Sequence, residues 1–99
     1  MNAIAARVQA PRFLNARNHL DFLDHLLEHA EAGALEVVVS FRQTLWVDST
    51  GLDTLLAAHR YFAAIPGGGV RVADLNDELV PLFAAAGLGD ALRPVAAAN

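Results

Sequence analysis

The chain has 99 residues, 55% of them hydrophobic, which predicts one globular domain spanning residues 1–99. All seven cations are arginine, and eleven carboxylates bring the formal net charge to −4. The sequence has no basic run, so it does not have the surface of a nucleic-acid-binding protein. It also has no cysteine, which excludes disulfides, thiolate nucleophiles and zinc–thiolate sites. Because no stretch resembles a membrane span or a signal peptide, we expect a cytoplasmic protein without direct membrane insertion.

The first third of the chain predicts a strand followed by a helix. Apolar residues alternate with others over residues 4–9, which is typical of a short strand. A helix is then expected from Asn18, a plausible N-cap, to Gly33, a plausible C-cap. Its inward stripe comprises Leu20, Leu23, Leu27 and Ala30.

The middle of the chain contains the strongest strand pattern. Residues 35–41 read Leu-Glu-Val-Val-Val-Ser-Phe, and three consecutive valines predict burial on both faces of a sheet with parallel neighbours. A polar loop follows, and residues 45–47 form a second apolar patch. The pattern leaves open whether Trp46, in that patch, belongs to the core or to a docking surface.

The last half predicts two more helices around a strand. One helix is expected from about Thr50 to Ala64, where residues 50–53 approximate a capping box with Asp in place of Glu. Residues 66–69 then lead into a strand over 70–73. Asn76 or Asp77 should cap a third helix whose first turn must contain Pro81. That helix should close at Gly87, before a last strand at residues 92–95.

The expected element order is therefore β-α-β-α-β-α-β. Helices that separate apolar strands are typical of an α/β domain with crossover connections. We expect a single small α/β domain with a mixed β-sheet of about four strands and three main helices.

Asp48-Ser49-Thr50-Gly51-Leu52 is the motif that suggests a function. It closes an apolar run and opens a helix, so its two hydroxyls lie where free backbone N–H groups and the helix dipole favour negative charge. A phosphate could be accommodated there. Ordinary helix capping explains the same residue types when they are considered alone.

Other candidate sites are weaker. His25 and His29 are spaced to chelate on one helix face, but no third ligand lies in sequence reach, so no metal is expected. The glycines of residues 66–69 lack the Gly-Lys-Ser/Thr ending of a phosphate-binding loop. A hydrolase site built from Asp48, Ser49 and His59 would lack a nucleophile elbow. We therefore expect no enzyme and no cofactor.

The motif and its flanks resemble the STAS domain, named after sulfate transporters and anti-sigma factor antagonists. The resemblance rests on the strand at 37–41, on residues 46–52, on Gly68-Gly69-Val70-Arg71-Val72, and on the close formed by residues 80–88. It covers about residues 18–95. Many family members have Asp or Asn at the position of Ser40.

The resemblance implies a protein-interaction regulator of the anti-sigma factor antagonist (anti-anti-sigma factor) kind, acting in bacterial transcription regulation. Its partner would be an anti-sigma factor kinase or another ATPase protein, and the domain itself would be a monomer or weak dimer. In such antagonists the second hydroxyl of the motif is phosphorylated, which here is Thr50, with Ser49 as second choice. The partner-binding residues would be Asp48, Ser49, Thr50, Gly51, Leu52 and Asp53.

Two alternatives remain open within the same resemblance. One is an accessory subunit that docks on the ATPase of a phospholipid-transport ABC complex, and the other is a stressosome-type scaffold. An operon containing a transporter would favour the first alternative, and a large homo-oligomer would favour the second.

Overall fold

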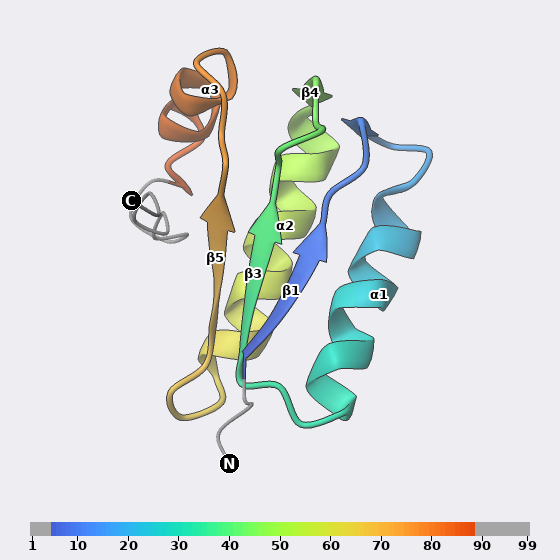
Figure 1. Cartoon of the computed structure of the whole chain (residues 1–99), viewed down its shortest axis with the longest axis vertical. Helices are drawn as coiled ribbons and strands as arrows, with labels where there is room; N and C mark the ends of the chain where they lie inside the picture. The colour runs from blue at the N-terminus through green and yellow to red at the C-terminus, as the bar shows by residue number, and fades with distance from the viewer. Residues whose placement is uncertain (1–4, 89–99) are drawn as a thin grey trace.

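The computed structural model describes residues 5–88, and it confirms a small α/β domain with three helices (Figure 1). Five strands accompany the helices, two of them only two residues long. The elements in chain order are β1 (Ala5–Gln9), β2 (Phe13–Leu14), α1 (His19–Glu31), β3 (Glu36–Ser40), β4 (Trp46–Val47), α2 (Ser49–Ala63), β5 (Gly69–Ala73) and α3 (Leu79–Ala85). The strand expected at residues 92–95 lies outside the described residues.

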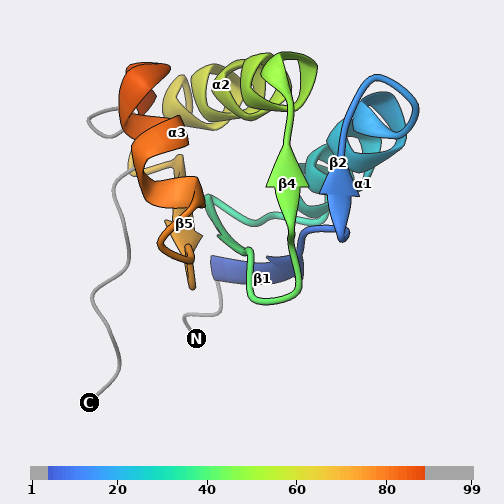
Figure 2. The same cartoon turned by 90° about the horizontal axis from the view of Figure 1, so that it is seen from above.

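The main sheet has three parallel strands in the order β1-β3-β5. Helices α1 and α2 lie side by side over one of its faces (Figure 2). Val37 and Val39 of β3 point into this layer and are fully buried, as are Val70 and Val72 of β5. The core therefore lies between the sheet and the two helices.

The expectation that all three valines of β3 would be buried on both faces is wrong for Val38. Val38 lies in register with Arg7 on β1 and Arg71 on β5, and it is only half-buried. Successive side chains of a strand point to opposite faces, so this row lies on the face away from α1 and α2. The two arginines make this face of the sheet more polar than the one that α1 and α2 cover.

Strands β2 and β4 form a separate parallel pair beyond the carboxyl ends of the main sheet (Figures 1 and 2). Phe13 is in register with Trp46, and Leu14 with Val47. Leu14 and Val47 are fully buried, whereas Phe13 and Trp46 are each about half exposed. This pair leads directly into α2 and so determines where that helix begins.

Two predicted helix starts are corrected by the hydrogen bonds. Asn18 does precede α1, but its side chain does not cap the helix. Its Nδ2 instead donates to the carbonyl of Phe13 (2.7 Å), and its Oδ1 accepts from the N–H of Asn15 (2.9 Å). The N-cap of α2 is Asp48, so residues 50–53 do not form a capping box. Both asparagine and aspartate form such local bonds readily.

The start of α3 agrees with the sequence. Oδ1 of Asn76 accepts from the N–H groups of Glu78 and Leu79, each at 2.9 Å. Pro81 lies in the first turn of α3, where a missing N–H removes no helical hydrogen bond. Gly87 follows the helix with a φ of 75°, a conformation that favours glycine. Within residues 5–88, no helix is long and apolar enough to cross a membrane.

Candidate functional site

The site begins with the cap of α2. Oδ1 of Asp48 accepts from the N–H of Gly51 at 2.9 Å, and the Asp48 carbonyl accepts from the N–H of Leu52 at 3.0 Å. The N–H of Asp48 itself donates to the carbonyl of Leu14, which holds the cap against β2. In the described part of the chain, the N–H groups of Ser49 and Thr50 have no hydrogen-bond partner. Two donors at the positive end of the helix therefore remain available to a negative group.

Gly51 is required by packing. A Cβ at this position would lie 2.8 Å from Cγ and from the carbonyl oxygen of Leu14, and 2.9 Å from Cγ1 of Val47. The first turn of α2 therefore contacts the β2–β4 pair as closely as two backbones allow. Leu52 is also buried, at 8% exposure. Both residues place the site but offer little surface to a partner.

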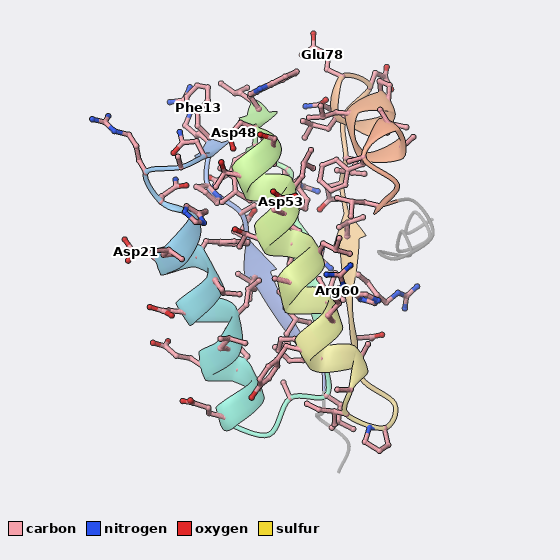
Figure 3. All side chains as sticks on the ribbon, turned by 180° about the vertical axis from the view of Figure 1, so that it is seen from behind. Phe13, Asp21, Asp48, Asp53, Arg60 and Glu78 are labelled. Atoms are coloured by element: carbon pink, nitrogen blue, oxygen red, sulfur yellow. The ribbon has the colours of Figure 1, made fainter. Side chains whose placement is uncertain are left out.

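The other four residues of the predicted docking set are accessible to different degrees. Ser49 and Asp53 are exposed, whereas Asp48 and Thr50 are half-buried. Figure 3 shows Asp48 at the start of α2 and Asp53 further along the same helix. The accessible part of the motif thus combines two hydroxyls with two carboxylates.

An apolar surface adjoins the motif, and the sequence indicated only part of it. Phe13 is 50% exposed, and Leu45 and Trp46 are each 48% exposed. Phe13 and Trp46 are register partners across β2 and β4, and we call these two residues with Leu45 the aromatic rung. Trp46 was a candidate because its apolar run precedes the motif. Phe13 was missed, because nothing in its local sequence shows that it pairs with Trp46.

A hydrogen-bond chain connects α1 to the first turns of α2. Nδ1 of His19 lies 3.0 Å from Oγ1 of Thr54, and Oγ1 of Thr54 donates to the carbonyl of Thr50 at 3.0 Å. Thr54 is buried and His19 is half-buried. No local pattern in the sequence indicates this contact, because the two side chains are 35 positions apart.

The structure does not assemble the hydrolase constellation. His59 follows Ser49 by ten positions on the same straight helix, which separates them by about 15 Å along its axis. Nδ1 of His59 instead accepts from the N–H of Val70 at 3.2 Å, at the edge of β5. His59 is therefore a core-edge residue, as its place on an apolar stripe predicted.

The histidine pair on α1 does not form part of a metal site in the described residues. His25 and His29 lie edge to face with ring centroids 5.2 Å apart. Nδ1 of His25 is 3.8 Å from a carboxylate oxygen of Glu28. Across residues 5–88, no group of three histidine, aspartate or glutamate side chains is arranged to hold a metal ion.

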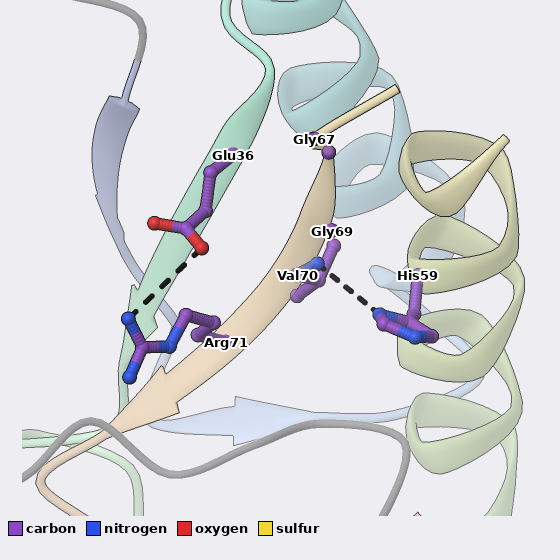
Figure 4. Close-up of a pocket in the computed structure, with 7 residues that line it drawn as sticks. Glu36, His59, Gly67, Gly69, Val70 and Arg71 are labelled. Carbon is purple, nitrogen blue, oxygen red and sulfur yellow. Dashed lines mark hydrogen bonds and ion pairs between the residues drawn. The ribbon is translucent and has the colours of Figure 1, made fainter. Parts of the chain in front are cut away.

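A pocket of about 350 Å³ lies at the opposite end of α2 (Figure 4). Its lining includes Gly67 and Gly68, which lie in the loop that connects α2 to β5. The N–H groups of Gly68, Gly69 and Val70 donate to Ile65, Leu35 and His59, respectively. Within the described residues, Gly67 has the one N–H of this loop that lacks a partner, so the loop offers a single free amide and serves mainly to connect α2 to β5.

Ser40 has a local role at the carboxyl end of β3. Its Oγ donates to Oδ2 of Asp74 at 2.6 Å, and Arg7 also donates to Oδ2 of Asp74, at 3.2 Å. Asp74 has a φ of 62°, in the left-handed region that few non-glycine residues adopt. The two bonds hold this turn in place after β5. The Ser40 hydroxyl therefore helps to stabilise the turn that follows β5.

Comparisons with known proteins support the fold and no more. No family model matches the chain, and no curated protein matches it. Nine chains of solved structures do match. One is the NMR structure of the protein TM1081, with a TM-score of 0.82 and 12% sequence identity, covering 96% of this chain and 76% of that chain. At this identity the likeness shows a shared fold.

Proposed function

We propose that this domain is a cytoplasmic protein-interaction regulator of the anti-sigma factor antagonist kind, with a STAS-type fold. It docks on a partner anti-sigma kinase through the amino end of α2. One observation carries the proposal: accessible hydroxyls and free amides of α2 lie directly beside the exposed aromatic rung. We assign no catalytic role to the domain, and the kinase would supply the nucleotide chemistry.

The aromatic rung would provide most of the binding energy. Aromatic side chains are enriched among the residues that dominate protein interfaces, and truncation of such a residue commonly costs 2 kcal/mol or more. Phe13 and Trp46 expose about half of their surface, and Leu45 extends the patch. Asp48 and Asp53 would lie at the rim, where charges affect orientation and association rate more than affinity. A partner with an apolar depression and a basic rim fits this surface.

Phosphorylation of Thr50, or of Ser49 as second choice, would switch the docking off. The γ-phosphoryl group of ATP would move to Oγ1 of Thr50, with release of ADP and of the hydroxyl proton to the kinase's base. The phosphate adds about −1.5 to −2 charges, which the free amides tolerate within the domain. At a docked surface its bulk and charge would be unpaired. A penalty of about 3 kcal/mol there weakens binding roughly a hundredfold.

The test uses the anti-sigma kinase encoded nearest to the gene of this chain. The purified chain is incubated with the kinase and ATP, and the product is mapped by mass spectrometry. We expect one phosphate on Thr50 of the unsubstituted chain. A Thr50→Val variant should carry no phosphate, and a Ser49→Ala variant should still be phosphorylated on Thr50. Affinity is then compared for the unmodified and phosphorylated chains. A kinase that binds the chain but leaves both hydroxyls unmodified would support constitutive docking and eliminate the switch. A kinase that neither binds nor modifies the chain would overturn the proposal.

A further inference from the structure

The bonds around Thr54 determine where the proton of His19 lies. A threonine hydroxyl has one proton, and that of Thr54 is donated to the carbonyl of Thr50. The oxygen of Thr54 must therefore accept from His19, so Nδ1 of His19 carries a hydrogen. In the described residues Nε2 of His19 has no hydrogen-bond partner. His19 is thus anchored to α2 through one ring nitrogen only.

The same bonds place His19 beside the predicted phosphorylation site. Thr50 and Thr54 are four positions apart on α2, and residues with this spacing lie on one helix face with Cβ atoms about 5–6 Å apart. His19 contacts this face from the first residue of α1. A group added to Oγ1 of Thr50 would therefore lie on the helix face that His19 contacts.

The local charges leave a phosphate at this place short of a counter-charge. Asp48 caps α2, Asp53 lies in its second turn, and Asp21 lies in the first turn of α1, so the nearby carboxylates are all repulsive. Arg17 precedes α1 in an exposed turn, where its backbone N–H donates to Asn15. His19 differs from Arg17 because a hydrogen bond already holds its ring against α2.

We propose that His19 is the counter-charge for a phosphate on Thr50. In its imidazolium form His19 would place a positive charge beside the phosphate while Nδ1 keeps its bond to Thr54. This inference rests on the proposed function and deepens it. The modification would then tighten the contact between α1 and α2 inside the domain, in addition to blocking the docked surface.

The test needs no kinase. Phosphothreonine is incorporated at position 50 of the full chain during synthesis, and ³¹P NMR follows the second ionisation of the phosphate across pH. A paired cation favours the doubly charged phosphate, so the unsubstituted chain should bind its second phosphate proton about tenfold more weakly than a His19→Asn chain. Asparagine keeps an N–H donor for Thr54 but has no charge, so the variant separates charge from anchoring. A His25→Asn chain, altered in a solvent-exposed histidine of the same helix, should behave like the unsubstituted chain.

Three outcomes would overturn the inference. The phosphate could titrate identically in the His19→Asn and unsubstituted chains, or the effect could appear equally in His25→Asn. The tenfold difference could instead appear in an Arg17→Gln chain, which would make Arg17 the counter-charge. Each result is independent of the proposed function, because a phosphate installed chemically reports on His19 even if no kinase modifies Thr50. A chain that responds at His19 but finds no partner would refute the proposed function alone.

Discussion

The two ends of α2 are alike in having a closely packed glycine, but they differ in how many backbone N–H groups they leave without a partner. At each end a glycine lies where a Cβ would clash. A Cβ at Gly51 would meet Leu14 and Val47 at the amino end, and a Cβ at Gly68, in the loop after the carboxyl end, would meet the carbonyl oxygens of Leu35 and Phe62. Close backbone packing alone therefore does not distinguish a functional end from a structural one.

The backbone amides do distinguish the two ends. In the loop after α2, the N–H groups of Gly68, Gly69 and Val70 are all bonded within the domain. At the start of α2, the described structure provides no partner for the N–H groups of Ser49 and Thr50. A glycine-rich loop attracts attention in a sequence, yet in the described residues it leaves only the N–H of Gly67 without a partner, whereas the helix start leaves two adjacent ones. Free donors at a helix dipole, rather than glycine content, indicate where an anion is tolerated.

The largest expected effect tests whether the carboxyl end is structural. A Gly68→Ala change would place Cβ against the carbonyl oxygens of Phe62 and Leu35, which are backbone atoms that cannot move aside cheaply. We expect a loss of about 3 kcal/mol in the free energy of unfolding, measured by urea denaturation. Gly69→Ala is the matched control, since its Cβ would meet only the His59 ring, at ordinary distances of 3.6 and 3.9 Å. Equal losses in the two variants would show that close packing at Gly68 is not what fixes this loop.

The next effect tests whether the amino end is the docking end. If the proposed kinase is the partner, Trp46→Ala should weaken binding to it by about 2 kcal/mol, or roughly thirtyfold, with little change in stability because Trp46 is half exposed. Calorimetric titration would measure the affinity. Tyr61→Ala is the matched control, because Tyr61 is an aromatic residue of similar exposure, 51%, near the carboxyl end of α2. A larger loss from Tyr61→Ala would place the docking surface at the opposite end.

Most of the fold followed from patterns within single elements. Apolar periodicity located the three helices, and the run of valines located the central strand of the sheet. The short pair β2–β4 was not predicted as a pair, because a two-residue strand has no periodicity and its partner lies 33 positions away. Half-burial of Val38 was also missed, since the sequence alone does not show which face of a sheet the helices cover.

Only the part of the candidate site that is continuous in the sequence could be predicted. The residues from Asp48 to Leu52 mark the end of a strand and the start of a helix, and the structure confirms that placement. The choice of cap was wrong, because Thr50 and Asp48 are both good cap residues and only the path of the preceding strand decides between them. Phe13 and His19 reach the site through tertiary contacts, for which a single sequence contains no signal.

The third effect concerns the cap itself. Asp48→Ala removes the acceptor for the N–H of Gly51, so we expect a loss of about 1 kcal/mol in the free energy of unfolding. Asp48→Asn keeps an acceptor oxygen without the charge, and it should retain most of that stability. When partner affinity is measured for both variants, the same comparison separates the effect of losing the cap from the effect of losing the charge. If Asp48→Ala is as stable as the unsubstituted chain, the amino end of α2 is held by Gly51 packing alone.

The smallest expected effect is at the pocket beside the glycine loop. Nη1 of Arg71 lies 4.0 Å from Oε2 of Glu36, and both side chains are about one-third exposed. Such a pair contributes little, so Glu36→Gln should change the free energy of unfolding by about 0.5 kcal/mol or less and leave partner affinity unchanged. Asp53→Asn provides the comparison, since a rim charge at the amino end should slow association with the kinase in stopped-flow measurements. A slower association for Glu36→Gln than for Asp53→Asn would mean that the partner approaches the carboxyl end of α2, and the contrast between the two ends would have to be reversed.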